Sequence, residues 1–394
     1  MKKSLIAVAV AGLFAAPVAM ADVTLSGAIN LGIEMGKTGA TTAGGASLTQ
    51  TLLNSNYSHV DLESVDDIGG GNKVIFHYQL IAQPQTTGTD NTNRNSFLGV
   101  TGTWGAFKMG TNENVYERMM YSADPLDGAV GPGGNLNILG TPGAGAIFQA
   151  GQCGGAATCG PGSPQVDFYR RTDNTICYES PNFNGISFEV DYTLSAHKTN
   201  GPPAVDPTVL SIGGKWQPEG APFYVDLSYE VHNDMFGGNA INGGTAGGTG
   251  SKDEGVQLGG GWSFGDLGLG LRYEKLTYNT TGSTNTHTEY KRDAYWLGVK
   301  YNMPSGYVGF EVGKANDGKN NVATVANTGA KMYGIGYFHN LSKQSQLQII
   351  YARTDNSSAA TYGQAGTPAG AGAGVTAGAG ADHDVFHVGL KHTF

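Results

Sequence analysis

The chain has 394 residues, of which 63 are glycine, 10% are aromatic and 14% are charged, and its formal net charge is −9. Such acidity argues against a nucleic-acid-binding protein, which would present a basic surface. Abundant glycine and aromatic side chains, with few charges, favour a β-rich architecture over one built from long helices.

The first 21 residues have the three parts of a secretory signal peptide. Lys2 and Lys3 form a basic start, Leu5–Ala16 an apolar core, and Ala19–Met20–Ala21 a small-residue cleavage site. The apolar run is shorter than the roughly 18 residues that a membrane-spanning helix needs, which favours cleavage before Asp22 over a membrane anchor. The exported chain would have 373 residues (394 − 21) and, without Lys2 and Lys3, a net charge of −11 (−9 − 2).

After Asp22, apolar and polar residues alternate with a period of two, which is typical of a strand with one apolar face and one solvent-facing polar face. Val23–Ile33 is the first such segment, and a Gly/Thr/Ser-rich loop follows to about Leu53. Tyr57–Asp66 and Lys73–Gln83 then flank the glycine-rich turn Ile68–Asn72, which predicts a hairpin. The same alternation recurs later, in Ile186–Leu194, Phe223–His232, Leu269–Glu274, Tyr295–Asn302, Val308–Val312, Tyr333–Tyr337, Leu347–Tyr351 and Asp384–Phe394.

Short turns and long connections alternate along the chain. Short turns are predicted at 102–105, 181–185, 218–222, 265–267, 303–306 and 340–343, and long polar or Gly-rich segments at 233–253, 316–329 and 356–382. Outer-membrane barrels have short turns at one rim and long loops at the other. No segment after the signal is long and apolar enough for a transmembrane helix, so a membrane protein of this sequence must be a closed barrel. We count sixteen strands and predict an all-β, sixteen-stranded antiparallel transmembrane β-barrel.

Two patterns favour a membrane barrel over a secreted β-sandwich. One face of the strands is aliphatic and aromatic, while the other carries charges such as Glu189, Asp226 and Arg272. Aromatic residues also gather near the strand ends, as the two interfacial girdles of a barrel require. The predicted girdle residues are Tyr192, Trp262, Phe264, Tyr301, Tyr307 and Phe394.

The segment from about 114 to 165 interrupts the regular succession of strands, short turns and loops. It is rich in Gly and Pro and far longer than an ordinary connection. Its first half has apolar residues that are able to pack, such as Tyr116 and Met120. A sixteen-stranded barrel leaves a wide aqueous lumen, which a packed segment folded inward would narrow. An external loop is the alternative, for which 141–162 is the candidate.

Three cysteines are an odd number for an exported protein. Cys153 and Cys159 bracket a Gly/Ala-rich segment and could close a small disulfide ring, worth about 2–2.5 kcal/mol by chain entropy. No His or carboxylate lies beside them, which favours a disulfide over a metal site. Cys177 is predicted to point into the lumen as a free thiol.

Six motifs are spread over nearly the whole mature sequence: Asp22–Gly27, Asp66–Gly71, Arg94–Val100 before Gly105, Arg171–Ile176 with Tyr178, Ser180–Gly185, and His392–Phe394. Together they resemble the Gram-negative general-diffusion porins, nearest to the neisserial and burkholderial branch. The resemblance implies an outer-membrane homotrimer of sixteen-stranded barrels, with the third loop folded inward as a constriction. It implies passive diffusion of ions and small hydrophilic solutes, no cofactor or metal, and contact with outer-membrane lipid and lipopolysaccharide. It also implies assembly by machinery that reads the C-terminal strand ending in Phe394.

In that family a basic ladder on the barrel wall faces acidic residues of the third loop. By motif position Arg94 and Arg171 match wall arginines, Arg170 is their neighbour, and His59 falls where a basic wall residue often sits. The implied acidic partners are Asp124 and Asp127, with Glu113 and Glu117 near the loop's entry. Ala28 and Thr111 occupy places that are often basic, so the resemblance implies a thinned ladder and a weakly cation-favouring pore.

Two alternatives stay open. A barrel enzyme would need a nucleophile, a base and an orienting group at one rim, whereas His232, His287 and His339 are scattered and neither H-E-x-x-H nor a phosphate-binding loop occurs. A substrate-specific channel would present an aromatic slide and usually more strands. We expect no enzymatic activity.

Overall fold

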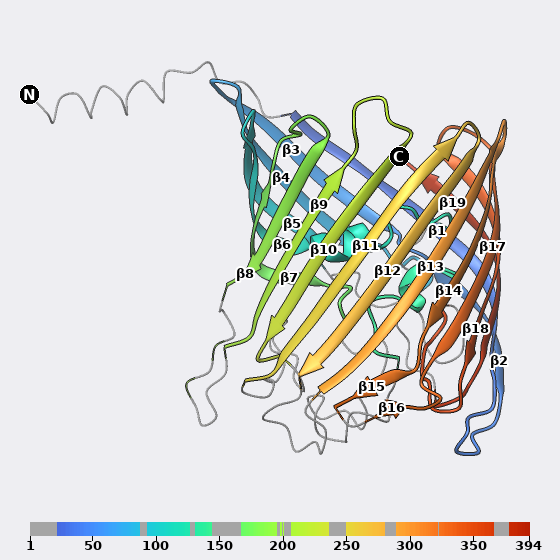
Figure 1. The fold of residues 1–394 in the computed structure, drawn as a ribbon. Helices are drawn as coiled ribbons and strands as arrows, with labels where there is room; N and C mark the ends of the chain where they lie inside the picture. The colour runs from blue at the N-terminus through green and yellow to red at the C-terminus, as the bar shows by residue number, and fades with distance from the viewer. Residues whose placement is uncertain are drawn as a thin grey trace, which may run out of the picture.

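The strands in which apolar and polar residues alternate pair into one closed antiparallel sheet (Figure 1). The computed structural model describes residues 22–86, 93–126, 131–143, 167–194, 198, 200, 206–235, 250–279, 289–321, 323–365 and 378–394. The strands are β1 (Asp22–Thr38), β2 (Leu48–Ser55), β3 (His59–Gly69), β4 (Asn72–Ile81), β5 (Asn93–Gly102), β6 (Gly105–Glu113), β7 (Arg171–Glu179), β8 (Ile186–Thr193), β9 (Thr208–Trp216), β10 (Phe223–Asn233), β11 (Lys252–Phe264), β12 (Leu267–Asn279), β13 (Glu289–Met303), β14 (Gly306–Ala315), β15 (Gly318–Asn320), β16 (Thr324–Val325), β17 (Ala330–Asn340), β18 (Ser345–Asn356) and β19 (His383–Thr393).

These nineteen segments build sixteen wall strands. β2 and β3 both pair with β1 and run in the same direction, so they are two parts of one strand. β15 prolongs β14 along β13, and β16 returns beside it towards β17, so this pair extends two wall strands as a short hairpin. The predicted sixteen-stranded barrel is confirmed.

The first and last strands close the barrel. β1 pairs with β19 from Ala28 opposite Thr393 to Thr38 opposite His383. Gly27 and Phe394 exchange two backbone hydrogen bonds of 3.1 Å at the end of this seam. Among the strands that the structure describes, this closure leaves no open sheet edge, whose unpaired backbone groups lipid could not satisfy.

The two rims differ as the sequence predicts. The rim near the start of β1 and the end of β19 carries the short turns, and the opposite rim carries the long connections (Figure 1). We call them the short-turn rim and the long-loop rim. Gly69, Gly70 and Gly71 all have positive φ in the first short turn, a conformation that suits glycine. Two predicted loops are shorter than expected, because β2 begins at Leu48 and the β15–β16 hairpin occupies part of 316–329.

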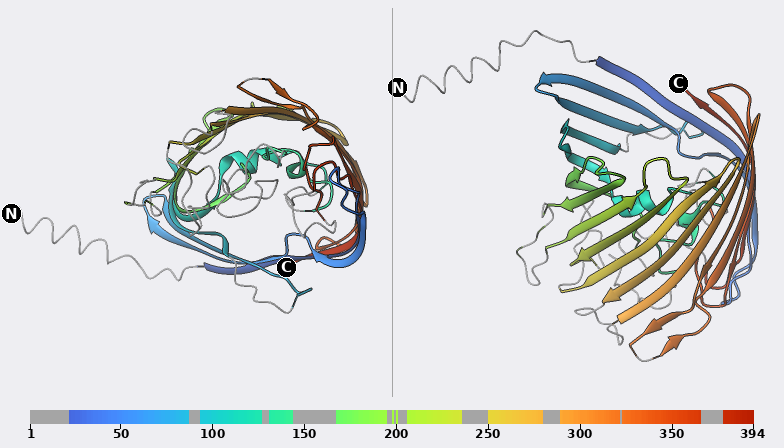
Figure 2. Two further views of the ribbon diagram at one scale, coloured as in Figure 1. Left: turned by 90° about the horizontal axis from the view of Figure 1, so that it is seen from below. Right: turned by 45° about the horizontal axis from the view of Figure 1, so that its top comes forward.

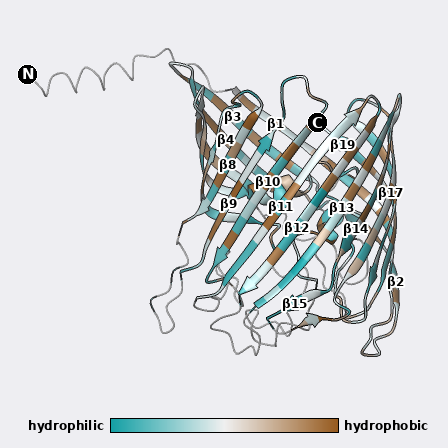
Figure 3. Ribbon diagram, viewed as in Figure 1, coloured by the Kyte–Doolittle hydropathy of each residue, from teal (hydrophilic) through white to brown (hydrophobic). Residues whose placement is uncertain are grey.

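Hydrophilic and hydrophobic residues alternate along the wall strands (Figure 3), so the outer and inner faces of the wall have opposite chemistry. Outward positions hold large apolar side chains such as Leu25, Leu271 and Ile335, which are exposed in the isolated chain. Tyr307 is a correction to the predicted girdle: it points into the lumen, where it stacks on Phe338 at 4.4 Å. None of the helical segments in the described residues has the length and apolar character of a transmembrane helix.

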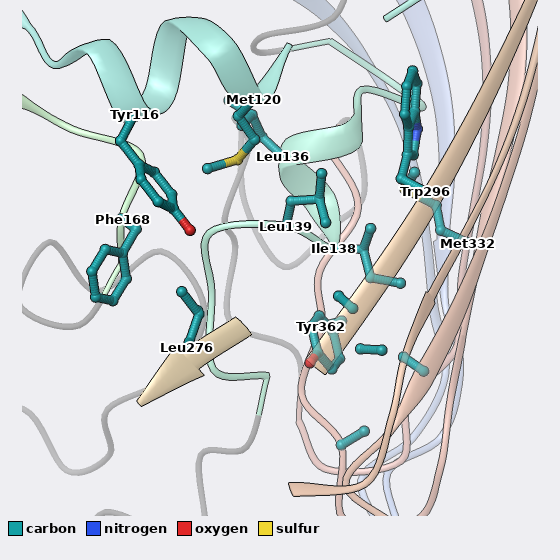
Figure 4. Packing of buried hydrophobic residues seen from close by; sticks show 14 of the residues in the cluster. Tyr116, Met120, Leu136, Ile138, Leu139, Phe168, Leu276, Trp296, Met332 and Tyr362 are labelled. Carbon is teal, nitrogen blue, oxygen red and sulfur yellow. The ribbon is translucent and has the colours of Figure 1, made fainter. Parts of the chain in front are cut away.

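The third connection at the long-loop rim, between Glu113 and Arg171, lies inside the barrel (Figure 2). It contains α2 (Val115–Met120) and the 3-10 helix η1 (Asn135–Asn137). Its apolar side chains pack against inward residues of β12, β13, β14 and β17, where Met120, Leu136, Ile138 and Leu139 share one cluster with Trp296 and Met332 (Figure 4). We call the described part of this connection, 114–126, 131–143 and 167–170, the inner loop.

Candidate functional site

Glycines on the inner face of the wall make room for the inner loop. A Cβ at Gly270 would lie 2.6 Å from Cβ of Ala123, and one at Gly309 would lie 2.6 Å from the carbonyl oxygen of Pro125. Both distances are shorter than van der Waals contact, so a larger residue at either position would displace the loop. The glycine track, defined by such contacts with the inner loop, consists of Gly213, Gly255, Gly270, Gly298, Gly309, Gly313, Gly334 and Gly336.

A buried ion pair fixes the middle of the inner loop to the wall. Arg292 of β13 and Glu274 of β12 are both fully buried, with 2.8 Å between Nη1 and Oε1. Arg292 also donates to the carbonyl oxygens of Ile138 (2.9 Å) and Thr141, and Glu274 accepts from the N–H of Gly140 at 2.9 Å. The pair therefore satisfies backbone groups that would otherwise be buried without partners.

The start of α2 is held by wall residues on the neighbouring strands. Asp191 of β8 accepts a hydrogen bond from the N–H of Val115 at 2.8 Å, and Ser211 of β9 accepts one from the N–H of Tyr116 at 3.1 Å. The first N–H groups of a helix have no partner within the helix, so these wall oxygens complete it. On the same side Arg118 forms an ion pair with Glu189.

A charged cluster lies where the inner loop leaves the wall. Arg171, the first residue of β7, pairs with Glu113, the last residue of β6, and its Nη1 lies 3.8 Å from Oε1 of Glu117. The Tyr121 hydroxyl donates to Glu113 at 2.5 Å. Arg94 lies beside this group with its guanidinium carbon 4.3 Å from the ring centroid of Tyr57. Four of the predicted charged residues are thus brought together, but as direct neighbours and not as two rows across an open gap.

Tyr57 reaches this cluster because the wall strand breaks between β2 and β3. Its φ is 60°, which is uncommon for a residue other than glycine. His59 follows with Nδ1 2.9 Å from the carbonyl oxygen of Tyr57 and Nε2 3.2 Å from Asp61. His77 of β4 also approaches Asp61, at 3.5 Å. The break therefore brings an aromatic ring and a histidine–carboxylate group to the lumenal face.

A cavity of about 470 Å³ lies between the inner loop and the seam of the barrel. On the loop side it is lined by Tyr121 and Asp124. On the wall side it is lined by Ala28, His59, Asp61, Glu113, Arg171, Lys391 and Thr393. The charged residues comprise three carboxylates, two permanent cations and one histidine, so opposite charges are nearly balanced.

Glu117 titrates differently from an exposed glutamate. Burial, reinforced by the neighbouring Glu113 carboxylate and opposed by Arg171 and Arg94, raises the pKa of Glu117 to about 8. One of its carboxylate oxygens, Oε2, has no hydrogen-bond partner among the described residues. The carboxyl group is therefore largely protonated at neutral pH, which lowers the negative charge of the cluster.

The other predicted site residues lie elsewhere or serve the loop itself. Asp124 accepts from the N–H groups of Leu126 (2.8 Å) and Asn135 (2.7 Å), so it shapes the loop as well as lining the cavity. Arg170 is not among the residues that line this cavity: its guanidinium donates to the carbonyl oxygen of Asp167 at 2.6 Å and approaches Glu230 at 4.0 Å. Asp127, Cys153 and Cys159 lie outside the described residues.

Sequence reasoning missed Tyr57, Tyr121 and Lys391 at the cavity, and it missed the glycine track. The signal for the track was present, because Gly334 and Gly336 alternate with the outward-facing Tyr333, Ile335 and Tyr337 along one strand. Lys391 also lies on the predicted polar face of the last strand, which faces the lumen. Tyr57 gave no signal, since nothing in the local sequence indicates the break in the strand.

Two arrangements test the alternative of catalysis. Gly261–Gly265 has the spacing G-x-S-x-G, but β11 runs through Trp262 to Phe264 into a hairpin turn and not into a helix, so Ser263 does not sit on a nucleophile elbow. Cys177 faces the lumen as predicted and, with Glu189 and Asp191, is the one group of potential metal ligands found in the described residues. Both carboxylates of this group already bind other parts of the protein: Glu189 forms an ion pair with Arg118, and Asp191 accepts a hydrogen bond from the N–H of Val115.

Comparisons with known proteins agree with this geometry. The model of the family described as "Gram-negative porin" matches residues 7–359. Outer membrane porin protein 32 of Delftia acidovorans is 27% identical over 404 residues, covering 100% of both chains, and the major outer membrane protein P.IB of Neisseria gonorrhoeae is 32% identical over 139 residues, 39% of its length. Among solved structures, the anion-selective porin from Comamonas acidovorans superimposes with a TM-score of 0.70 at 21% identity, covering 95% of this chain and 100% of that one.

Proposed function

Because the chain belongs to the Gram-negative porin family and is an outer-membrane channel for passive diffusion, we propose that the inner loop filters its solutes by size and charge. The single observation that carries this proposal is the placement of the loop. It is fixed inside the lumen by the Arg292–Glu274 pair, and it borders the cavity of about 470 Å³ described above, which we call the constriction cavity.

The charges around the constriction cavity support weak selectivity for cations. Asp61, Glu113 and Asp124 carry three negative charges against the two permanent positive charges of Arg171 and Lys391. Charged groups that line a narrow passage act strongly on ions, whereas groups a Debye length of about 8 Å away are screened by physiological salt. Because Arg171 is paired with Glu113, the local field is small, and solutes of either sign would pass.

Planar-bilayer recording tests the proposed filter. The purified protein should give ohmic openings, with a reversal potential in a KCl gradient that lies slightly on the cation-selective side. Folded protein that inserts and conducts no ions would contradict the channel. A strong preference for anions would contradict the proposed charge filter while leaving the channel intact.

We propose further that the channel is a homotrimer, as the sequence resemblance implies. The outer wall near the seam supports an association surface, since Val23, Leu25, Ile33 and Leu62 are exposed there in the isolated chain. Three conductance steps per insertion event, and a trimer mass by native mass spectrometry in detergent, are expected. A monomer under both conditions would contradict the proposal.

The outer wall also offers a place for the phosphates of lipopolysaccharide. Lys314 of β14 and Lys331 of β17 lie directly opposite each other on the outer face, towards the long-loop rim. Two like charges in such a cross-strand pair repel each other, and Asp355, the partner of Lys331 on its other side, is ion-paired with Arg353, so an added anion near the two lysines would be stabilising. Lipopolysaccharide should therefore stabilise the wild-type protein against heat more than a Lys314→Gln, Lys331→Gln variant, and equal stabilisation would contradict this contact.

Two proposals concern export and assembly. Residues 1–21 are removed as a signal peptide, so the outer-membrane form should begin at Asp22, where β1 also begins; a form that retains Met1 would contradict this. Phe394, whose side chain is 46% exposed, is a recognition element for barrel-assembly machinery. Phe394→Ala should lower the yield of folded barrel in the outer membrane while refolding in detergent continues. Equal yields would contradict that role.

A further inference from the structure

Three side chains that can bind a metal ion meet on the lumenal face of the wall beside α2. Cys177 of β7 lies directly opposite Asp191 of β8, and Glu189 is the next inward residue of β8. Phe188 and Tyr192 are exposed on the outer face, so Glu189 and Asp191 point inward, as Cys177 does. All three side chains are buried, and one donor atom from each lies within 4.8 Å of the other two.

The spacing of these donor atoms is close to that of one coordination sphere. Zn²⁺ binds thiolate sulfur at about 2.3 Å and carboxylate oxygen at about 2.0–2.2 Å, so neighbouring donors of a tetrahedral site lie about 3.4–3.6 Å apart. Sγ of Cys177 lies 3.4 Å from Oε1 of Glu189. The donor atom of Asp191 lies no farther than 4.8 Å from either, so a small side-chain movement completes the sphere.

The charges around the three ligands leave one buried carboxylate without a counter-ion. Arg118 pairs with Glu189, and Lys108 pairs with Glu179. Among the described residues no Lys or Arg nitrogen lies within 4.0 Å of the Asp191 carboxylate. Its Oδ2 accepts a backbone N–H of α2 at 2.8 Å, whereas its Oδ1 is buried and has no hydrogen-bond partner in the described part of the chain. A buried oxygen in this state costs free energy, which a bound cation would recover.

A divalent metal ion would balance the charge of this group. It displaces the proton of the Cys177 thiol, so the S–H bond breaks, a metal–sulfur bond forms and one H⁺ passes to solvent. Its two positive charges then match the thiolate and the carboxylate of Asp191. Arg118 keeps a partner when Glu189 binds the ion, because its Nη1 also lies 3.7 Å from Glu179. The side chains of Arg118 and Glu179 are 34% and 31% exposed, which gives the ion a path from the lumen.

We propose that Cys177, Glu189 and Asp191 form a binding site for one Zn²⁺ or Cd²⁺ ion, with water as the fourth ligand. A sulfur donor beside two oxygens favours these metals over Ca²⁺ and Mg²⁺, which prefer oxygen donors throughout. The inference goes beyond the proposed function, because the site requires no ion flow through the channel. Val115 and Arg118 of α2 contact two of the ligands, so a bound ion fastens the start of the inner loop to β7 and β8.

Titration of the purified, folded protein with Cd²⁺ in detergent tests the site. Cd²⁺ should produce a thiolate-to-metal charge-transfer absorption in the ultraviolet that saturates at one ion per chain, with release of one proton. Excess Zn²⁺ should displace Cd²⁺ and abolish the band, whereas equal concentrations of Ca²⁺ or Mg²⁺ should leave it unchanged. A folded wild-type protein without a saturable band would overturn the proposal. Displacement by Ca²⁺ as effective as that by Zn²⁺ would also overturn it.

Variants assign the band to its ligands. Cys177→Ser should abolish the band, and Asp191→Asn should raise the dissociation constant for Cd²⁺ at least tenfold. The matched control is the double variant Cys153→Ser, Cys159→Ser, which keeps Cys177 and should bind Cd²⁺ as the wild type does. A band that is lost in this control and kept in Cys177→Ser would overturn the site.

Heat stability gives a second measurement that does not depend on absorption. A ligand that binds only the folded state stabilises it, so Cd²⁺ should raise the Tm of the wild type and of the control variant. It should leave the Tm of Cys177→Ser unchanged, and an equal rise in all three proteins would overturn the site. A folded protein that binds Cd²⁺ and conducts no ions would contradict the proposed function and leave the metal site intact.

Discussion

Glu274 holds Arg292 with one carboxylate oxygen at 2.8 Å while the same carboxylate accepts the N–H of Gly140, so one wall residue joins two strands to the inner loop. Tyr116 donates its hydroxyl to the other oxygen of Glu274 at 3.1 Å. The position of the loop thus depends on a fully buried carboxylate whose charge is balanced by a single guanidinium.

Replacing Arg292 by methionine should release the middle of the inner loop. Removal of one partner leaves Glu274 buried without compensation, a loss of about 3–5 kcal/mol in other proteins. We expect larger and noisier single-channel currents and cleavage of the loop by a protease that spares the wild-type barrel. Arg353→Met is the control, because Arg353 is partly exposed and pairs with Asp384 on the outer wall. Quiet, wild-type currents from Arg292→Met would show that the anchor is dispensable.

Arg171→Gln should shift ion preference towards cations. The substitution removes one positive charge beside Glu113 and Glu117 and leaves the carboxylate of Glu113 without its pair. A change in the cation-to-anion permeability ratio on the order of twofold is expected for one charge at a narrow passage. Reversal potentials in a KCl gradient measure it, with Lys343→Gln at the rim as the control. An unchanged reversal potential would place Arg171 outside the conducting path.

Glu117 should make the channel pH-dependent near pH 8. Burial, together with Glu113, raises the pKa of Glu117 from its ordinary value of 4.5 to about 8, against the opposing effect of Arg171 and Arg94. The neutral form prevails at pH 6 and the charged form at pH 9, so cation preference should rise across this range. Glu117→Gln should abolish that component of the pH dependence. A titration of the same size in both proteins would assign it to other groups.

The same pKa predicts a stability effect of definite sign. The folded protein binds the Glu117 proton more tightly than the unfolded chain between pH 4.5 and about 8. This contribution to stability is complete below pH 4.5 and is lost as the pH rises through 8. Melting curves of wild type and Glu117→Gln should therefore diverge on the alkaline side, in the direction of lower wild-type stability. Parallel curves would contradict the raised pKa.

Gly309→Ala should disturb the inner loop, whereas Gly268→Ala should not. A Cβ at Gly309 would meet the carbonyl oxygen of Pro125 at 2.6 Å, while one at Gly268 has its nearest neighbour at 3.7 Å. Overpacking of this kind typically costs about 1–3 kcal/mol. Single-channel conductance and heat stability should change in the first variant only. Identical behaviour of the two would show that the loop yields without cost.

Thiol titration tests the predicted disulfide. With Cys153 and Cys159 joined, the denatured but unreduced chain should react with one equivalent of a thiol reagent, and with three after reduction. The single reactive group should be Cys177, which is 2% exposed in the folded protein and has its Sγ 3.4 Å from Oε1 of Glu189. Three equivalents without reduction would contradict the disulfide.

The strands could be predicted because alternation is a local property of the sequence. Every second residue is apolar from Phe223 to Val231 in β10 and from Phe386 to Leu390 in β19, and that period indicates which face meets lipid. The same alternation places Tyr307 inward, because Val308, Phe310 and Val312 occupy the outward face, whereas its stacking on Phe338 of another strand is not a local property. Family motifs singled out Arg94 and Arg171, which lie close to each other beside Tyr57 and Glu113. The direction of the Arg170 side chain is set by its hydrogen bond to the carbonyl oxygen of Asp167, and the sequence spacing of charged residues does not predict that contact.

The seam between β1 and β19 lines part of the constriction cavity and also closes the barrel. Lys391 and Thr393 on one side, and Ala28 on the other, line the constriction cavity while their backbones pair across the seam. A two-residue shift in the register between β1 and β19 would leave apolar side chains facing lipid and polar side chains facing the lumen. It would nevertheless move Lys391 about 7 Å along the wall. A barrel closed in the wrong register would therefore also have an altered permeability, and conductance measurements would detect it.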